Sequence, residues 1–337
     1  MAMYWMPGTS SRASRFSPVR NRSMPAEAAQ ARWMASATIS AHEGREAITD
    51  PTPAVYSHPW MKRILTALVL IPSVLVLVFL GSRWLFTLAV AGVAALAAWE
   101  FLGLAEKSGA KPPRAAVMAA VLALFAGNFE WPDETAAIFG LLSLGLVVYC
   151  TFFSDVREML ADVATAILCL VYTGMTLIAL PALREDTEFN GPSLVAFLLC
   201  AIWAGDIAAL YVGRSLGKHK MAPTLSPNKS WEGAVGSLAG SLAAAGILLG
   251  LSNTLAEWNI ERLSFHGEAW YCWLALAALI NLAAQAGDLA ESAIKRSVGA
   301  KDSGTMVPGH GGVLDRIDAM ILAAPALWYA LTIHKLF

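Results

Sequence analysis

The sequence predicts an all-α, polytopic integral membrane protein. Of its 337 residues, 57% are hydrophobic and only 15% are charged, a charge content well below that of soluble domains. Apolar segments long enough to cross about 30 Å of hydrocarbon recur from residue 64 onward. The loops between these segments alternate between many and few Lys and Arg residues, as expected for a chain that crosses a membrane repeatedly.

Composition also excludes some classes of protein. The net charge is -1, so nothing in the overall charge indicates a nucleic-acid partner. The four cysteines are isolated, no C-x-x-C pair occurs, and each cysteine lies in an apolar run: Cys150, Cys169, Cys200 and Cys272. A zinc site or a disulfide framework is therefore not expected, and buried, inert thiols are.

Residues 1–60 differ in composition from the rest of the chain. They are rich in Ser, Ala, Met, Pro and Arg, and their first part is free of acids, which is typical of a transit peptide. Glu43, Glu46 and Asp50 depart from that pattern, so we favour a disordered extension, or a start codon upstream of Met61. The sequence thus predicts a disordered or presequence-like segment at 1–60 and a membrane domain at 61–337.

The membrane domain contains nine candidate spans, although the third is short. They lie near 64–80, 84–104, 115–127, 136–153, 161–182, 193–211, 233–251, 269–286 and 317–334. About nine transmembrane helices is therefore our best estimate.

Loop charge predicts that the N-terminus lies inside and the C-terminus outside. With that orientation, the inside loops carry most of the basic residues: Lys107, Lys111, Arg114, Arg157, Arg214, Lys218, Lys220, Lys229, Lys295, Arg296, Lys301 and Arg316. The outside loops hold only Arg83, Arg184, Arg262 and Lys335. This distribution follows the positive-inside rule.

Carboxylates gather at the predicted inner edge of the membrane. Glu100, Asp206, Asp288, Asp315 and Asp318 lie at or near the inner ends of spans. Ionisable groups at membrane depth are costly and indicate a functional site by default. The two long polar loops, 212–232 and 287–316, fall on the same side, so the site is expected to face the cytoplasm.

The C-terminal polar loop predicts a site for a divalent cation. If 286–297 is helical, Asp288, Glu291, Ser292 and Lys295 share one face of that helix. Asp315 and Asp318 share a face of the next helix. Two helices could then present carboxylates to one magnesium ion, with water and phosphate oxygens completing its octahedron. The alternative is an ordinary loop of solvated, mutually paired charges.

A glycine-rich turn precedes the ninth span. Gly309, His310, Gly311 and Gly312 offer consecutive N–H groups in a turn that glycine adopts easily, next to a helix N-terminus that favours anions. The alternative is a plain loop in which glycine only permits the turn. His310 has three open roles: bonding a phosphate oxygen, donating a proton, or orienting the loop.

The other polar loop, Gly213 to Gly233, suits a polyphosphate. Its candidate groups are Arg214, Lys218, Lys220, Lys229, Ser226, Asn228 and Ser230. It is not a P-loop, because three residues and not four separate Gly213 from Gly217, and no Ser or Thr follows Lys218. The alternative is a basic loop that only sets topology.

These residues resemble the phosphatidate cytidylyltransferase (CDP-diacylglycerol synthase) family over roughly residues 61–337. The family's signature, S-x-aliphatic-K-R-x4-K-D-x-small-x2-aliphatic-P/G-x-H-G-G-x2-D-R-x-D, is met from Ser292 to Asp318, with Val307 as a mild departure. The segment Ser226–Gly233 is similar to the family's S-P-x-K-T-x-E-G, with Ser230 keeping the hydroxyl. A match this long and rich in charge is specific.

The resemblance implies transfer of CMP from CTP to phosphatidate, with Mg²⁺ as cofactor, to give CDP-diacylglycerol and pyrophosphate in phospholipid biosynthesis. The partners are then CTP, phosphatidate and the lipid bilayer, and the location is the bacterial inner (plasma) membrane with the active site facing the cytoplasm. A homodimer is one open oligomeric state. Because the phosphomonoester of phosphatidate is already anionic at neutral pH, no serine or histidine base is needed.

The hypothesis assigns a role to each candidate residue. Asp288 and Asp315 are the leading metal ligands, and Asp206 and Asp318 are secondary ones. The phosphates of CTP or lipid are bound by Lys229, Lys295, Arg296, Lys301 and Arg316, with His310 also in the catalytic set. Hydrogen bonds to substrate come from Ser226, Asn228, Ser230, Ser292, Gly309, Gly311 and Gly312.

Three other functions compete with this one. A transporter would carry polar residues deep in several spans and inverted repeats, whereas here the ionisable residues gather at one edge. A CDP-alcohol phosphotransferase needs D-G-x2-A-R followed by G-x3-D-x3-D, which the sequence lacks. A non-catalytic scaffold would have no need of the charged residues that match the family signature. CTP consumption that requires phosphatidate separates all three from the favoured function.

Overall fold

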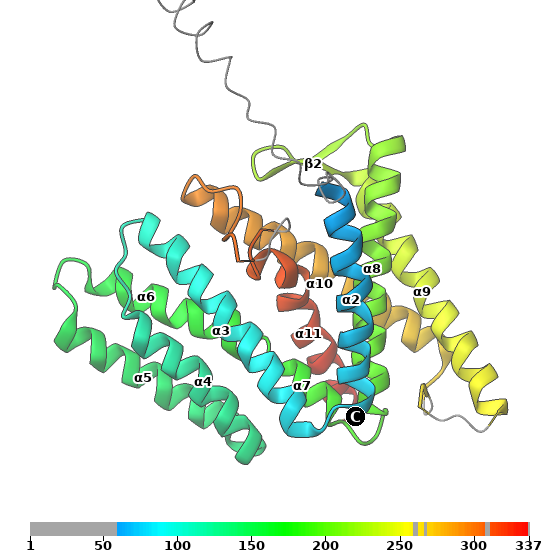
Figure 1. The fold of residues 1–337 in the computed structure, drawn as a ribbon, viewed down its shortest axis with the longest axis horizontal. Helices are drawn as coiled ribbons and strands as arrows, with labels where there is room; N and C mark the ends of the chain where they lie inside the picture. The colour runs from blue at the N-terminus through cyan, green and yellow to red at the C-terminus, as the bar shows by residue number, and fades with distance from the viewer. Residues whose placement is uncertain (1–58, 259–261, 266–267, 307–310, 336–337) are drawn as a thin grey trace, which may run out of the picture. The chain divides into compact units, whose positions relative to one another are not determined.

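The protein is nearly all-α, as predicted. A computed structural model describes residues 59–258, 262–265, 268–306 and 311–335, and Figure 1 shows its helices and one β-hairpin. The predicted extension lies outside the described residues, except that the first helix already begins at Pro59.

The first half of the membrane domain consists of helices joined by short links. They are α2 (Pro59–Leu80), α3 (Arg83–Lys107), α4 (Arg114–Glu130), the 3₁₀ turn η1 (Pro132–Glu134) and α5 (Thr135–Phe153). The next span is interrupted: α6 (Met159–Cys169) passes through a π-helical segment, η2 (Leu170–Met175), before α7 (Ala179–Arg184).

The second half of the domain contains four long helices. They are α8 (Gly191–Leu216), α9 (Trp231–Glu257), α10 (Trp270–Ser297) and α11 (Leu314–Lys335). α10 continues well past its predicted span, so the condition that 286–297 is helical holds, and Asp315 falls in the first turn of α11.

A small hairpin between α8 and α9 departs from the all-α prediction. β1 (Lys220–Ala222) and β2 (Ser226–Ser230) are antiparallel, with Lys220 opposite Ser230 and Ala222 opposite Ser226. The strands are too short to be predicted from an alternating apolar pattern in the sequence. The hairpin keeps the start of α9 close to the end of α8.

Seven of the helical segments are long and apolar enough to cross a membrane. They are α3, Pro132–Phe153, Met159–Arg184, α8, α9, α10 and the Leu314–His334 part of α11. The two other predicted spans fall on α4, which has 17 residues, and on α2, whose side chains are described from Leu68 to Leu80 and are predominantly apolar there. All nine predicted segments are thus helical, while nine crossings stays a prediction.

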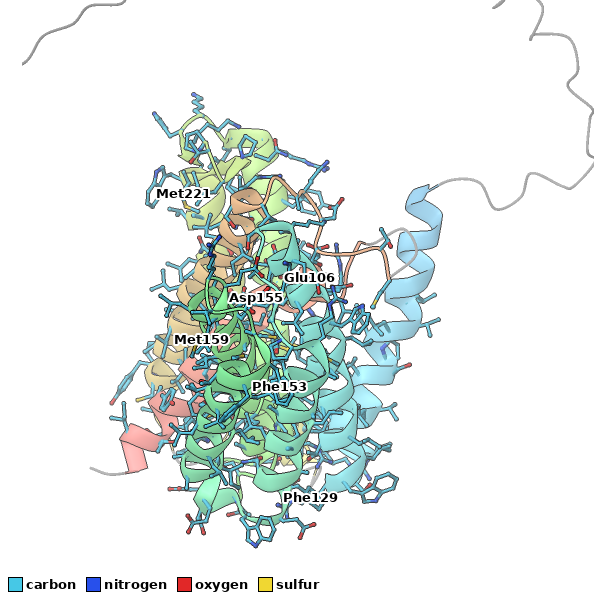
Figure 2. The ribbon with its side chains drawn as sticks, turned by 90° about the vertical axis from the view of Figure 1, so that its left-hand side faces the viewer. Glu106, Phe129, Phe153, Asp155, Met159 and Met221 are labelled. Carbon is cyan, nitrogen blue, oxygen red and sulfur yellow. The ribbon has the colours of Figure 1, made fainter. Side chains whose placement is uncertain are left out.

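The helical domain starts and finishes at opposite ends of the bundle. α2 begins at the end that carries the hairpin, and α11 finishes at the other end (Figure 1). Figure 2 shows Met221 of the hairpin toward one end and Phe129 of α4 at the other, with Glu106 of α3 nearer to Met221. An odd number of crossings requires this arrangement.

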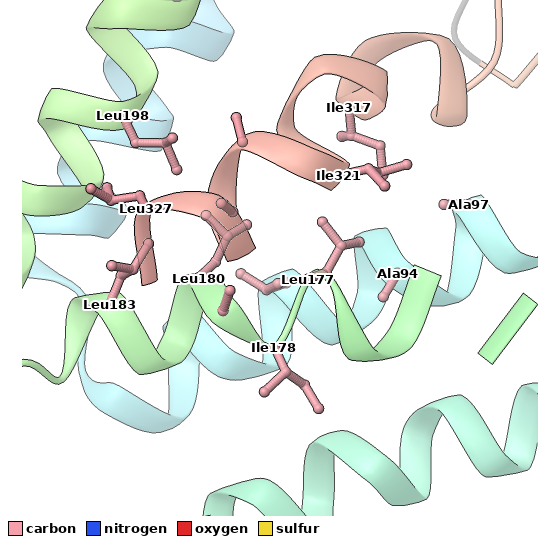
Figure 3. Close-up of a cluster of buried hydrophobic side chains, with 14 of the residues drawn as sticks. Ala94, Ala97, Leu177, Ile178, Leu180, Leu183, Leu198, Ile317, Ile321 and Leu327 are labelled. Atoms are coloured by element: carbon pink, nitrogen blue, oxygen red, sulfur yellow. The ribbon is translucent and has the colours of Figure 1, made fainter. Parts of the chain in front are cut away.

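The core brings α3 against α7 and α11. Ala94 and Ala97 on α3 are completely buried, and Figure 3 shows them facing Leu177 and the Ile317 and Ile321 side chains of α11. Small side chains let helices approach closely in a membrane protein. This contact places the first turn of α11 beside the end of α3.

Small residues also bring α8 and α9 together. A methyl group at Gly240 would lie 2.5 Å from the Cβ atom of Ala208, and one at Gly236 would lie 2.6 Å from that of Val212. Both glycines therefore serve the close helix contact. The contact fixes the distance between the two walls of the cavity described next.

Candidate active site

A cavity of about 250 Å³ lies between α8, the hairpin, α9 and α10. Asp206 of α8, Lys229 of β2 and Asp288 of α10 line one part of it, and Ser237, Asn281 and Gln285 line another. Asn228 and Ser230, also predicted site residues, contribute to its wall. The structure therefore brings five predicted residues from three separate parts of the sequence to one cavity.

An ion pair joins the two polar loops at this cavity. The Lys229 ammonium nitrogen lies 2.6 Å from a carboxylate oxygen of Asp288, and both side chains are partly buried. Lys229 is the cation that the hairpin contributes to the cavity wall. A lysine held in this way can exchange its carboxylate for a phosphate oxygen with little movement.

Three carboxylates share the region of this ion pair. Asp206, Asp288 and Asp318 lie close enough to repel one another electrostatically. The backbone of α10 at Gly287 packs directly on the carbonyl of Asp318, because glycine leaves no Cβ atom between the helices. Acids from α8, α10 and α11 therefore converge, with Lys229 as the adjacent cation.

The chemistry of this donor set fits magnesium. All three groups are hard oxygen ligands, and a cation between them would relieve their repulsion. Among the described residues, no three His, Cys, Asp or Glu side chains lie close enough to hold one ion together. Magnesium is usually bound by only one or two carboxylates, with water and substrate phosphates as its other ligands, and this site can supply such a set.

A buried hydrogen-bond network underlies the cavity. Asn281 donates to the hydroxyls of Ser237 and Ser241, each at 2.8 Å, and its side-chain oxygen accepts a hydrogen bond from Gln285 at 2.6 Å. Ser241 in turn donates to the carbonyl of Ala201 on α8. The network links α8, α9 and α10 below Asp206 and Asp288. None of its side chains was in the predicted site.

A second charged cluster lies where α10 meets the start of α11. The ammonium of Lys295 is 2.7 Å from Asp315 and 2.5 Å from Glu291, whose side chain is completely buried. The predicted phosphate ligand Lys295 therefore already bridges two carboxylates. The same bridge occupies Asp315, which the sequence proposed as a leading metal ligand.

Asp315 also holds the loop that precedes α11. Its carboxylate accepts hydrogen bonds from the backbone N–H groups of Ser303, at 3.1 Å, and Gly312, at 2.8 Å. Gly311 has a φ of 84°, which favours glycine, and a Cβ atom there would press on Asp315. The N–H of Gly312, predicted to bind an anion, thus meets an anion from within the chain.

Glu100 supplies a second anion to the same helix start. Its carboxylate accepts hydrogen bonds from the N–H groups of Val313 and Leu314 and from the hydroxyl of Ser303. The sequence marked Glu100 only as a carboxylate at a membrane boundary. The three donors to this carboxylate are more than 200 residues away in the sequence, so no local pattern could identify them.

The other predicted residues occupy varied positions. Ser230 caps α9, its hydroxyl oxygen accepting the N–H of Gly233 at 3.2 Å, while Arg296 donates to the carbonyls of Leu225 and Ala300. Ser226 and Ser292 are half-buried, and Lys301 and Arg316 are exposed. Gly309 and His310 lie outside the described residues, so their predicted roles stay predictions.

Tyr172 reaches the charged region from the π-helical segment η2. Tyr172 is 7% exposed, and its phenol oxygen is buried without a hydrogen-bond partner among the described residues. It interacts electrostatically with Glu291, Asp318 and Asp288. A π-helical segment often accompanies a functional site, but the sequence around Tyr172 carries no signal that would have identified it.

The fold and the site together define an integral membrane protein with a charged, phosphate-compatible cavity near one end of its helices. The chain belongs to the cytidylyltransferase family, whose model matches residues 61–334. That match covers the whole described domain apart from its ends and confirms the family resemblance.

Known relatives carry a consistent name. A "Phosphatidate cytidylyltransferase" of Haemophilus influenzae is 32% identical over 290 residues, covering 80% of this chain and 97% of that protein. One of Pseudomonas aeruginosa is 36% identical over 285 residues, with the same coverage. One of Brucella suis biovar 1 is 42% identical over 159 residues, and there this chain spans only about half of the relative, 54%.

Proposed function

We propose that this protein transfers CMP from CTP to phosphatidate, giving CDP-diacylglycerol and pyrophosphate. The observation that carries the proposal is the cavity in which Lys229 and Asp288 form an ion pair beside Asp206 and Asp318. The family membership and the names of the relatives support the same reaction.

In the proposed reaction, an oxygen of the phosphatidate phosphate attacks the α-phosphorus of CTP. A new P–O bond forms as the bond from that phosphorus to the bridging oxygen breaks, and pyrophosphate leaves with the bond electrons. The attacking phosphate is already ionised, so no protein base has to remove a proton. The protein's work is to bring two anions together and to stabilise the charge on the leaving group.

Each charged group of the site has a role in that work. Lys229 faces the cavity and would bind a phosphate oxygen of CTP in place of Asp288. Lys295 would keep its position through Glu291 and Asp315 while its charge attracts the second phosphate. Arg296 would fix the hairpin against α10, since it already bonds the carbonyl of Leu225.

One or two of the carboxylates Asp206, Asp288 and Asp318 would hold magnesium, with water and the phosphates of CTP as its other ligands. The bound ion would supply charge neutralisation for the phosphates of CTP. Asp315, which the sequence ranked with Asp288, would act mainly by holding Lys295 and the loop, because these groups already use its oxygens.

We further propose nine membrane crossings with the N-terminus inside, in the bacterial inner membrane, and with the cavity open toward the cytoplasm. Loop charge supports this orientation. Residues 61–337 would form the catalytic membrane domain, and residues 1–60 an extension outside it. The homodimer stays a prediction, which light scattering of the detergent-purified protein would test.

The direct test uses purified protein, labelled CTP, magnesium and phosphatidate. We expect one labelled CDP-diacylglycerol and one pyrophosphate per CTP consumed, and no consumption when phosphatidate or magnesium is omitted. Diacylglycerol in place of phosphatidate serves as the control lipid, because it lacks the nucleophilic phosphate. CTP turnover that ignores phosphatidate would reject the proposal.

A further inference from the structure

Glu100 is the buried carboxylate whose contacts the proposed reaction does not use. It lies near the end of α3, in the first half of the chain, and is 4% exposed. A charged carboxylate buried to this degree is costly unless hydrogen bonds and opposite charge compensate it. The groups that donate hydrogen bonds to Glu100 therefore indicate its role.

Three groups at or just before the start of α11 donate hydrogen bonds to Glu100. The N–H of Val313 donates at 3.0 Å, the N–H of Leu314 at 2.9 Å and the hydroxyl of Ser303 at 2.9 Å. The two N–H groups belong to the helix start, where unpaired donors and the helix dipole favour an anion. α3 thus supplies the N-terminal cap that α11 takes from outside its own sequence.

Two glycines leave room for this carboxylate. A Cβ atom at Gly304 or at Gly312 would collide with the Glu100 carboxylate, and one at Gly312 would also collide with the Ser303 hydroxyl. At Gly312 a side chain is therefore excluded by Ser303 and Glu100 together. The carboxylate fills a space that the loop leaves open for it.

The same loop residues hold Asp315. Ser303 gives its hydroxyl to Glu100 and its N–H to Asp315, and Gly312 gives its N–H to Asp315. Asp315 in turn lies 2.7 Å from the ammonium of Lys295. A continuous series of contacts therefore runs from Glu100 through Ser303 and Asp315 to Lys295.

We propose that Glu100 is a positioning residue of the active site: it fixes the start of α11 and Ser303, and through them Asp315 and Lys295. The inference rests on the proposed function for its kinetic consequence but not for its structural one. It makes α3 part of the catalytic machinery, although α3 lines no part of the cavity.

The first test is independent of activity. Lys301 is exposed and lies two residues before Ser303, so trypsin cleavage after Lys301 in the folded, detergent-purified protein reports how firmly this segment is held. We expect Glu100→Ala and Glu100→Gln to raise that cleavage rate roughly tenfold or more, because a hydrogen-bonded charge is lost or replaced by an amide that cannot accept all three bonds.

The matched control is Asp162→Asn. Asp162 is also a buried carboxylate, 2% exposed, that accepts a hydrogen bond from the backbone N–H of Lys111 at 2.6 Å, but it lines a different cavity, together with Lys111 and Glu158. We expect this variant to leave cleavage after Lys301 and the KM for CTP unchanged. Its unfolding temperature serves as the measure of what losing a buried carboxylate costs the fold.

The second test is kinetic. For folded Glu100→Gln we expect kcat/KM for CTP to fall roughly ten- to hundredfold. Ser303→Ala should cause a smaller loss alone and almost none in a Glu100→Ala background, since both changes remove the same contact. Ser303→Ala also serves as the test should Glu100→Ala fail to fold.

The outcomes separate the two hypotheses. Wild-type cleavage and wild-type kinetics in folded Glu100→Gln or Ser303→Ala, with only a lower unfolding temperature, would make Glu100 a purely structural cap and overturn the inference. Wild-type protein that does not use CTP and phosphatidate would overturn the proposed function. The cleavage result would still decide whether Glu100 holds the segment.

Discussion

At the scale of single residues, the site depends on which charge faces which. Asp288 and Asp315 were paired in the sequence hypothesis, yet their side chains meet different lysines, Lys229 and Lys295. The sequence placed them on two consecutive helices, which are α10 and α11 in the structure. It could not assign the ion pairs, because side chains separated by one helical turn can select different partners from neighbouring elements.

Lys229→Met should abolish most of the activity. We expect kcat/KM for CTP to fall roughly 100-fold, since the substitution removes the cation that faces the cavity and the developing charge on phosphate. Labelled CTP incorporation into lipid measures it. Lys111→Met is the control, because Lys111 also pairs with a carboxylate, Glu158 at 3.0 Å, but away from the cavity. Equal losses in both variants would contradict the role of Lys229.

Asn281→Ala should destabilise the protein by about 1–2 kcal/mol. The substitution leaves the hydroxyls of Ser237 and Ser241 and the amide of Gln285 without their shared partner. Unfolding in a denaturing detergent measures the change. Asn128→Ala removes one hydrogen bond, to Thr135 at 2.8 Å, outside the cavity, and should cost less. A larger effect at Asn128 would argue against the network.

At the scale of elements, helix contacts set the geometry of the cavity. Gly205 on α8 faces the network: a Cβ atom there would lie 2.7 Å from the Asn281 amide nitrogen and 2.8 Å from the Ser241 hydroxyl. The helices can therefore approach only because the residue is glycine. The interrupted span α6–η2–α7 also shapes the site, since its π-helical segment carries Tyr172, which interacts electrostatically with the acids of the charged region.

Gly205→Ala should push α8 away from α10. We expect a destabilisation of about 1–3 kcal/mol and a raised KM for CTP, because Asp206 follows directly on α8. Gly246→Ala on α9 is the opposite control: its Cβ atom would meet nothing within 4 Å, and alanine should stabilise the helix by about 0.5–1 kcal/mol. The stability of both variants is measured in the same unfolding assay. A neutral Gly205→Ala would refute the close contact.

At the scale of the whole molecule, the orientation in the membrane decides which substrates can reach the cavity. The hairpin and the α4–η1 link lie at opposite ends of the helices, as Met221 and Phe129 show in Figure 2. CTP is a charged cytosolic nucleotide, so the proposed function requires the hairpin end to face the cytoplasm. The positive-inside rule gives the same orientation independently of any substrate.

Cysteine labelling tests that orientation. In a chain whose four native cysteines are replaced by alanine, Asp133→Cys beside α4 should react with a membrane-impermeant maleimide in intact cells. Lys220→Cys in the hairpin should react only after the membrane is opened. The reversed pattern would place the cavity outside and would exclude the proposed use of CTP, while labelling of both positions in intact cells would contradict the separation of the two ends.

The sequence by itself determined the helical membrane class, the nine helical segments and the family. Hydrophobic length and loop charge are local properties, and the Ser292–Asp318 signature is contiguous, so both can be read without coordinates. A helix over 286–297 was only a condition of the sequence hypothesis, and α10, which continues to Ser297, meets that condition.

Only the tertiary structure decided which groups meet. The contact of Glu100 with Leu314 spans 214 residues, the Asn281 network joins three helices, and Lys229 reaches Asp288 from a hairpin that no pattern announced. These pairings depend on how closely helices approach, which small residues such as Gly205 and Gly240 permit. That distance is a property of packed surfaces, and no single segment of the chain contains it.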